Sequence, residues 1–260
     1  MMRTDGVSDW NPGAYARFRD LRARPAHDLM MAVRSVGGGD VIDLGCGNGA
    51  IGPGLKERFS GHRVIGVDGS PAMLAKAGET GAYDALVETD IADWNVARAG
   101  LIFSNAALHW LDGHEMLFPR LAGMLATGGT LAVQMPHQNN APSHRLWTSL
   151  ADEFFPGRVE QVTAPGVLKP PFYFHLLAGL GRFSLWETEY YQVLGADESG
   201  HPVRRFTEST YARPILDALD PEEQADLIAR YEEVMEKAYP RGEDGTVLFP
   251  FRRMFFTLTV

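Results

Sequence analysis

A short apolar run followed by alternating glycines constrains this chain more than any other feature: Val41-Ile42-Asp43-Leu44-Gly45-Cys46-Gly47-Asn48-Gly49. The apolar residues predict a buried strand, and the residues after the glycines predict a helix near 50–59. Glycine has no Cβ, so the backbone at Gly45 and Gly47 can approach a ligand closely, and the helix N-terminus offers unpaired N–H groups. The segment therefore predicts a strand, turn and helix that bind a nucleotide-like molecule.

Strand-like and helix-like segments alternate through the first half of the chain. The further strand-like runs are residues 63–68, 84–89, 100–104 and 130–135. Helices are expected at 25–36, with Pro25 in the first turn, at 50–59, after Ser70-Pro71, and near 114–126. This alternation predicts an α/β fold with a parallel, doubly wound sheet.

The pattern changes after Pro136, where the sequence becomes polar and proline-rich. Helices are expected near 143–154, 172–180, 201–218 and 221–239, and β-rich runs at 183–194 and 246–260. We therefore expect a core made of residues 1–136, 183–194 and 246–260, and a helical cap or substrate region made of residues 137–182 and 195–245.

Composition excludes several classes of protein. The formal net charge is −9 and no run of lysines or arginines stands out, so a nucleic-acid partner is not expected. Cys46 is the single cysteine, which excludes an intrachain disulfide and a cysteine-based metal site. No apolar stretch reaches the ~20 residues of a membrane span, and the first residues do not form a secretion signal. A cytoplasmic protein without metal is expected.

Two nucleotide cofactors compete for the glycine turn. Gly45-x-Gly47-x-x-Ala50 also satisfies a relaxed NAD fingerprint, and an acid such as Asp68 after the second strand suits the ribose hydroxyls of either cofactor. Asp43 lies two residues before the first glycine, where a negative charge suits the ammonium group of S-adenosylmethionine (AdoMet). Asp90 and Ile91 follow the third strand, where an acid and an apolar side chain suit an adenine. This series of acids favours AdoMet over NAD.

Here the chain resembles class I methyltransferases, and more closely the trans-aconitate methyltransferase family. The resemblance runs nearly end to end. Its motifs include Tyr15-Ala16-Arg17-Phe18, Asp43-Leu44-Gly45-Cys46-Gly47, Asp68-Gly69-Ser70-Pro71-Ala72-Met73, Asp90-Ile91-Ala92-Asp93-Trp94, Asn105-Ala106-Ala107-Leu108-His109-Trp110, Leu131-Ala132-Val133-Gln134-Met135-Pro136, Pro142-Ser143-His144 and Arg213-Pro214. It implies a Rossmann-like sheet, mostly parallel with an antiparallel closing strand, and an inserted helical cap.

The resemblance also implies site residues. Cofactor-binding positions are Asp43, Gly45, Cys46, Gly47, Asp68, Gly69, Met73, Asp90, Ile91 and Asn105. Acceptor-side positions are Arg24, Trp110, Tyr173, Tyr211, Arg213 and Arg253, with Arg213 and Arg24 ranked first, because a guanidinium grips a carboxylate with two parallel hydrogen bonds. His109 and Tyr15 are the candidate catalytic residues.

The implied function is O-methylation of a small carboxylate-bearing molecule, trans-aconitate-like, by a monomer or homodimer. A carboxylate is ionised near pH 7 and needs no general base. The sequence departs from the family pattern at His109, where glutamine is usual, at His137-Gln138, at Ala141 and at Tyr211-Ala212. Three alternatives stay open: another small acceptor with His109 as base, a NAD-dependent oxidoreductase, and an AdoMet-fold binding module without turnover.

Overall fold

The computed structural model of the protein describes residues 19–159, 166–196, 199–208 and 211–260. The chain divides into two compact units. Unit 1 comprises Met1–Met135, Leu168–Trp186 and Met254–Val260, and unit 2 comprises Pro136–Val167 and Glu187–Arg253. Within the described part of the chain, no helix combines the length and apolar character that a membrane crossing requires.

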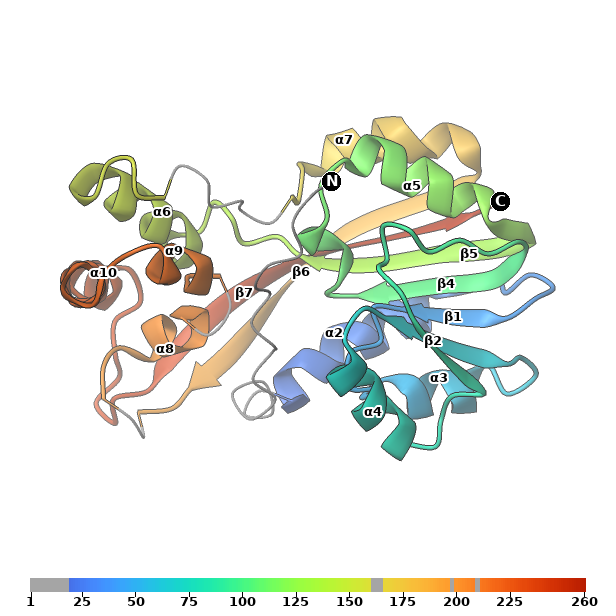
Figure 1. The fold of residues 1–260 in the computed structure, drawn as a ribbon, viewed down its shortest axis with the longest axis horizontal. Coiled ribbons are helices and arrows are strands. Elements are labelled where there is room, and N and C mark those ends of the chain that lie inside the picture. Colours follow the sequence, from blue (N-terminus) through green and yellow to red (C-terminus); the bar gives the residue numbers. More distant parts are fainter. Residues whose placement is uncertain (1–18, 160–165, 197–198, 209–210) are drawn as a thin grey trace. The chain divides into compact units, whose positions relative to one another are not determined.

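A seven-stranded sheet runs through the molecule in the order β3-β2-β1-β4-β5-β7-β6 (Figure 1). Its strands are β1 (Val41–Leu44), β2 (Val64–Asp68), β3 (Ala85–Glu88), β4 (Ala99–Asn105), β5 (Leu125–Pro136), β6 (Arg182–Leu194) and β7 (Val247–Thr259). Strands β1, β2 and β4 are almost wholly buried, which explains why they read as continuous apolar runs.

Strand direction matches the expected fold class. The pairs β1–β2, β1–β4, β2–β3 and β4–β5 are parallel. Against β5, strand β7 runs the other way, since Val260 N–H donates to Gly129 O near the start of β5 while His137 N–H, just after its end, donates to Arg252 O. The α/β prediction with an antiparallel closing strand is confirmed. The carboxyl ends of the parallel strands meet at one edge, where such sheets bind ligands.

Five α-helices of unit 1 connect or flank these strands in the described chain: α2 (Arg19–Ala32), α3 (Gly52–Arg58), α4 (Pro71–Glu79), α5 (His114–Gly123) and α7 (Pro170–Leu177). As predicted, Ser70 caps α4, and its hydroxyl accepts a hydrogen bond from Met73 N–H at 3.3 Å. Helix α3 packs on β2, α4 packs on β2 and β3, and α5 packs against α7 (Figure 1).

The first helix differs from its prediction. It covers Arg19–Ala32 instead of 25–36, so Pro25 lies inside it. It ends early because the following residues bind the sheet: Ser35 Oγ donates to Gly128 O at 2.9 Å, and Gly37 N–H donates to Gly100 O at 3.0 Å. A Cβ at Gly37 would lie 2.7 Å from Gly129 N, so only glycine permits this approach.

Unit 2 holds four α-helices in its described residues: α6 (Pro142–Phe154), α8 (Pro202–Glu208), α9 (Arg213–Asp217) and α10 (Pro221–Ala238). The prediction of one helix over 201–218 is wrong. Pro214 has no N–H and cannot continue a helix from the preceding turn, so the segment forms α8 and α9. As expected from the helix predicted near 221–239, α10 begins at Pro221, and Asp220 and Glu223 form a capping box.

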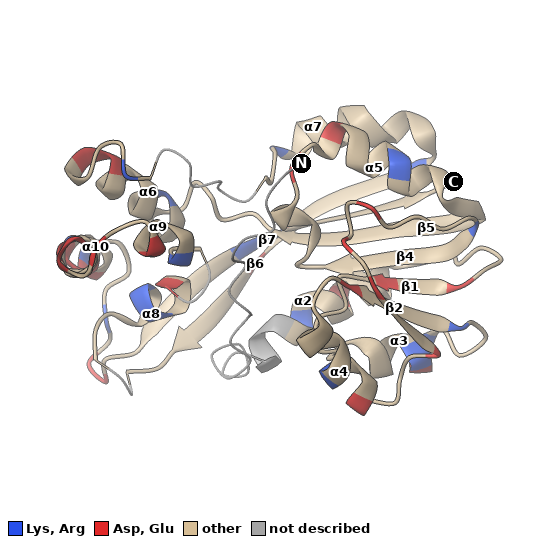
Figure 2. Cartoon of the chain, viewed as in Figure 1, with Lys and Arg blue, Asp and Glu red and all other residues tan. Residues whose placement is uncertain are grey.

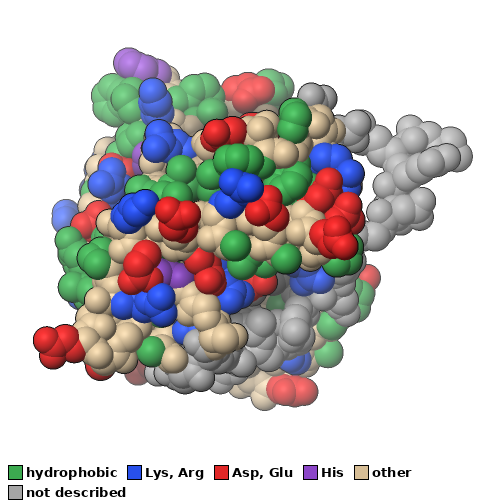
Figure 3. All heavy atoms as spheres, turned by 90° about the vertical axis from the view of Figure 1, so that its left-hand side faces the viewer, with side chains coloured by type: hydrophobic (Ala, Val, Ile, Leu, Met, Phe, Trp, Pro, Cys, Tyr) green, Lys and Arg blue, Asp and Glu red, His purple; other side chains and the backbone are tan. Residues whose placement is uncertain are grey.

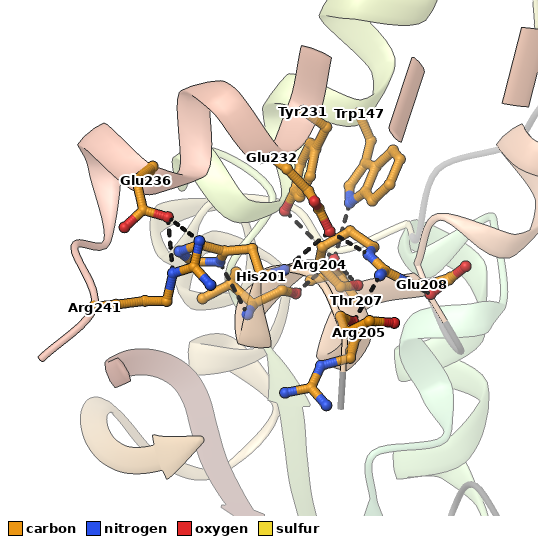
Figure 4. Close-up of polar contacts among 12 residues, drawn as sticks. Trp147, His201, Arg204, Arg205, Thr207, Glu208, Tyr231, Glu232, Glu236 and Arg241 are labelled. Atoms are coloured by element: carbon orange, nitrogen blue, oxygen red, sulfur yellow. Dashed lines mark hydrogen bonds and ion pairs between the residues drawn. The ribbon is translucent and has the colours of Figure 1, made fainter. Parts of the chain in front are cut away.

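A polar network joins α6, α8 and α10 within unit 2 (Figure 4). Trp147 Nε1 donates to Thr207 Oγ1 at 2.9 Å, and the Trp147 ring stacks on Tyr231 with 3.8 Å between ring centroids. Arg204 Nε donates to Glu232 Oε1 at 2.7 Å, and the same oxygen accepts from His201 N–H at 2.9 Å. The buried contacts among Trp147, Thr207 and Tyr231 give unit 2 a core of its own.

The unit boundaries differ from the expected division in two respects. Helix α7 belongs to unit 1, because Tyr173 and its neighbours pack against α5. The second half of β6 and the first half of β7 belong to unit 2. Unit 2 therefore lacks α7 and includes parts of two strands.

Charges of both signs are interspersed on unit 2 (Figures 2 and 3). On α10, Arg230 pairs with Asp226 at 2.9 Å and Lys237 with Glu233 at 3.2 Å. Arg241, just after α10, pairs with Glu236 at 2.7 Å. The face drawn in Figure 3 thus presents mixed charge instead of one basic patch.

Candidate cofactor site and acceptor residues

The glycine turn after β1 has the backbone that its sequence predicts. Gly45 has φ +78° and Gly47 φ +54°, both in the left-handed region that favours glycine. A Cβ at Gly45 would lie 2.2 Å from the Cβ of Ala107, whereas a Cβ at Gly47 would meet nothing within 4 Å. Gly45 is therefore required by the packing of the protein, and Gly47 borders open space that a ligand can use.

Asp68 connects the end of β2 to this turn. Its Oδ2 accepts a hydrogen bond from Gly47 N–H at 2.8 Å, and its Oδ1 accepts one from Ser70 N–H at 2.9 Å. Each oxygen keeps a further lone pair for a ribose hydroxyl. Beside it, Gly69 is exposed and Met73 is buried.

Asp43 lies in the interior, at the end of β1. Its side chain is nearly fully buried, and its Oδ2 accepts a hydrogen bond from Tyr83 Oη at 2.7 Å. Burial raises the Asp43 pKa to about 7, the Tyr83 hydrogen bond opposes this shift, and the charge of Asp68 adds to it. Its Oδ1 has no partner among the described residues, so one oxygen remains for a cationic ligand group.

Three predicted residues lie just after β3 or at the end of β4. Asp90 Oδ1 accepts a hydrogen bond from Ala92 N–H at 2.8 Å, and Ile91 Cδ1 lies 3.2 Å from the position of a Cβ on Gly45. Asn105 ends β4, and its Oδ1 is buried without a hydrogen-bond partner among the described residues. An orphaned acceptor beside the open turn fits a ligand with N–H or O–H donors.

Cys46 lies in the turn and is buried. Burial, followed by the charges of Asp43 and Asp68, raises the pKa of its thiol far above neutrality. The thiol therefore has no thiolate character, and Cys46 fits the turn as a small residue. Within the described residues, no group of three or more His, Cys, Asp or Glu side chains is placed to hold a metal ion.

The acceptor-side residues of unit 1 divide into exposed and buried ones. Trp110 and Arg24 are exposed, and His109 is buried with its ring centroid 4.6 Å from that of Trp110. Tyr173 is fully buried: its hydroxyl lies 2.8 Å from His114 Nδ1 and accepts from Leu168 N–H at 2.9 Å. The structure thus places Tyr173 in the core of unit 1. Tyr15 lies outside the described residues.

In unit 2 the structure brings two predicted acceptor residues into one cluster. The ring centroids of Tyr211 and His144 are 4.7 Å apart, and those of His144 and Phe251 are 5.9 Å apart. The Arg253 guanidinium lies over the Phe251 ring, 4.7 Å from its centroid. Arg253 and His144 are both buried, so this acceptor cluster combines a buried cation with a buried imidazole.

Arg213 lies in a different environment. Its side chain is 42% exposed and faces Asp217 at 3.7 Å, one turn along α9. An exposed ion pair of this kind contributes little to the stability of the fold. His144 belongs to the Pro142-Ser143-His144 motif, but only the fold shows that it contacts Tyr211 and Phe251.

A family model described as a methyltransferase domain matches residues 42–133. Trans-aconitate 2-methyltransferases from Paracidovorax citrulli and Methylobacterium nodulans are 39% and 40% identical to this chain, and each match covers 96% of this chain and 97% of the relative. The enzyme of that name from Escherichia coli O1:K1 is 36% identical with the same coverage. The chain belongs to the trans-aconitate 2-methyltransferase family.

Solved structures support the fold. The YcgJ protein of Bacillus subtilis superimposes with a TM-score of 0.58 at 12% identity, covering 91% of this chain and 98% of that one. Geranyl diphosphate methyltransferase gives a TM-score of 0.51 at 19% identity, with 92% and 79% covered. As a member of the trans-aconitate 2-methyltransferase family, the protein is an AdoMet-dependent methyltransferase, which decides against the NAD alternative.

The burial of His144 predicts a pH dependence of stability. Burial lowers its pKa from 6.5 to about 3, so below pH 6.5 the unfolded chain binds a proton that the folded chain does not. This site therefore costs up to about 1.4 kcal/mol of unfolding free energy for each pH unit below that point.

Urea unfolding at pH 7 and pH 5 tests this, with the exposed His175→Gln variant as control. His144→Gln should lose less stability between the two pH values than the wild type, and His175→Gln should lose as much as the wild type. Equal losses in all three proteins would contradict the prediction.

Proposed function

We propose that this protein transfers the methyl group of AdoMet to a carboxylate of a small polycarboxylic acid, with trans-aconitate as the first candidate. The observation that carries the proposal is the nearly full-length similarity, 36–40% identity over 95–96% of the chain, to relatives named for that activity. The acceptor cluster of unit 2 supports it, because a buried guanidinium such as Arg253 suits a carboxylate.

The cofactor side follows from the edge of the sheet. AdoMet supplies a methyl group bound to a positively charged sulfur. We assign its ammonium group to Asp43 Oδ1, its ribose hydroxyls to Asp68, and its adenine to Asp90 and Ile91, with the open space at Gly47 admitting the ligand. Asn105 Oδ1, buried and without a partner among the described residues, supplies one further acceptor. Gly69 and Met73 follow Asp68 in the same segment.

The acceptor side has mainly to orient its substrate. A carboxylate oxygen forms a bond to the methyl carbon as the carbon–sulfur bond breaks, and no proton moves. Placing the two groups in line lowers the barrier by up to about 7–11 kcal/mol. Arg253 neutralises the acceptor carboxylate, and Tyr211 and His144 shape its surroundings. Trp110, Arg24 and Arg213 are exposed or half-exposed, and they remain predicted contacts of secondary importance.

A methyl-transfer assay tests the proposed acceptor. Trans-aconitate, cis-aconitate, citrate and isocitrate are each incubated with AdoMet and the protein, and S-adenosylhomocysteine is measured. A methyl ester releases methanol in alkali, whereas N- or C-methyl products do not, so alkaline hydrolysis identifies the bond formed. Turnover with trans-aconitate and alkali-labile product supports the proposal; AdoMet binding without turnover on any of the acids contradicts the choice of acceptor.

His109 discriminates between a carboxylate acceptor and one that needs a base. If the acceptor is a carboxylate, His109→Gln should keep kcat within about threefold and leave its pH profile unchanged, because no proton is removed. If His109 is the base for a hydroxyl or amine, kcat should fall by roughly 100- to 10,000-fold. Steady-state kinetics across pH on the best acceptor separate these outcomes.

A further inference from the structure

Tyr83 lies beside the glycine turn and reaches a residue 40 positions earlier in the chain. Its hydroxyl donates to Asp43 Oδ2 at 2.7 Å. Burial and the neighbouring Asp43 carboxylate raise the Tyr83 pKa, so the phenol stays protonated and acts as a donor to that oxygen. The hydrogen bond therefore has a fixed direction.

Three glycines leave room for the Tyr83 ring. A Cβ at Gly52 would lie 2.6 Å from Tyr83 Cζ, one at Gly66 3.0 Å from Cδ1, and one at Gly49 3.1 Å from Cε2. These glycines come from the turn after β1, the start of α3 and the middle of β2. Any larger residue at Gly52 would displace the ring, so the local sequence accommodates this side chain.

The backbone next to Tyr83 is also held in place. Asp84 N–H donates to Val64 O at 2.8 Å, and Asp84 Oδ2 accepts from Val64 N–H at 2.7 Å and from Lys56 Nζ at 2.5 Å. Asp84 thus links the start of β3 to β2 and α3 through hydrogen bonds. With both ring and backbone held, the hydroxyl has little freedom to point elsewhere.

We propose that Tyr83 is a positioning residue for AdoMet: its hydroxyl occupies Asp43 Oδ2 and so directs the free Oδ1 toward the ammonium group of the cofactor. The inference rests on the proposed contact between Asp43 and that ammonium group. It also explains how a nearly fully buried carboxylate stays usable as an anion, because a hydrogen bond to the charged form favours it over the protonated form.

The test is the pH dependence of S-adenosylhomocysteine binding, measured by calorimetry from about pH 5.5 to 8. The wild type should lose affinity below about pH 7, as Asp43 takes up a proton. Tyr83→Phe keeps the aromatic ring packed against the three glycines but removes the hydroxyl. It should weaken binding roughly three- to tenfold at pH 8 and raise the midpoint of the profile by at least about half a pH unit.

Leu86→Ala is the matched control, because Leu86 also borders Gly66 but its apolar side chain cannot donate a hydrogen bond to Asp43. It should lower the melting temperature and leave the midpoint unchanged. A Tyr83→Phe profile with the wild-type midpoint would overturn the proposal and leave Tyr83 a packing residue. If Asp43→Asn binds S-adenosylhomocysteine with wild-type affinity, the proposed contact of Asp43, on which the inference rests, is wrong. If the wild type does not bind, the cofactor assignment itself is wrong.

Discussion

Gly45→Ala should weaken S-adenosylhomocysteine binding by roughly 100-fold or more. The new Cβ would lie 2.2 Å from the Cβ of Ala107, and the alanine would have to adopt φ +78°. Overpacking and a left-handed alanine each cost on the order of 1–3 kcal/mol, and 1.4 kcal/mol corresponds to tenfold in affinity. Ala107 cannot easily move away, because Ala106, with φ +53°, donates its N–H to Gln134 O at 2.9 Å.

Two further variants separate the clash from the backbone strain. Gly113→Ala places alanine at φ +67° where a Cβ meets nothing within 4 Å, so binding should be unchanged. Ala107→Gly in the Gly45→Ala background removes the clashing atom and should recover at least about tenfold in affinity. Calorimetric titration measures all three. Wild-type binding by Gly45→Ala, or no recovery in the double variant, would contradict the packing argument.

The cofactor half of the site was predictable because its signals are local. Asp43, Asp68 and Asp90 each follow a strand-like run, and parallel strands bring their carboxyl ends to one edge. The need for glycine at Gly45 and Gly47 can likewise be read from one short segment. Such features depend on neighbours in the chain and on the strand order, both of which the alternating pattern implies.

The contacts that fold distant segments together were not predictable in this way. Tyr83 meets Asp43 only through the register of β1, β2 and β3, and nothing in the residues around Tyr83 marks it. Whether Arg253 or Arg213 is buried depends equally on tertiary packing. By contrast, the break between α8 and α9 had a local signal, Pro214. The prediction of one helix over 201–218 followed the helical pattern of the flanking residues instead.

Burial favours a different order of the acceptor arginines from the one that the sequence predicted. The sequence ranked Arg213 and Arg24 first, but Arg24 is exposed and Arg213 is 42% exposed beside Asp217. Arg253 is only 4% exposed and lies over Phe251 in the acceptor cluster. A charge-assisted hydrogen bond is stronger in a buried setting, where water and salt screen it less.

Arg253→Met should therefore raise the KM for the carboxylate acceptor by about 100-fold, which corresponds to roughly 2.7 kcal/mol and lies within the cost of losing one partner of a buried charge pair. The affinity for S-adenosylhomocysteine should not change, since Asp43, Asp68 and Asp90 are untouched. Arg253→Lys should recover only part of the loss, because an ammonium group lacks the planar fork that binds a carboxylate through two hydrogen bonds.

Arg252→Met is the matched control: it is the adjacent residue, its side chain is 53% exposed, and it lies 3.7 Å from Glu189. We expect this variant and Arg213→Met to keep KM within about threefold, as exposed pairs contribute little. Thermal unfolding of each variant separates a lost contact from a lost fold. If Arg213→Met raises KM and a folded Arg253→Met does not, the acceptor carboxylate binds at α9, and burial is the wrong criterion for choosing the arginine.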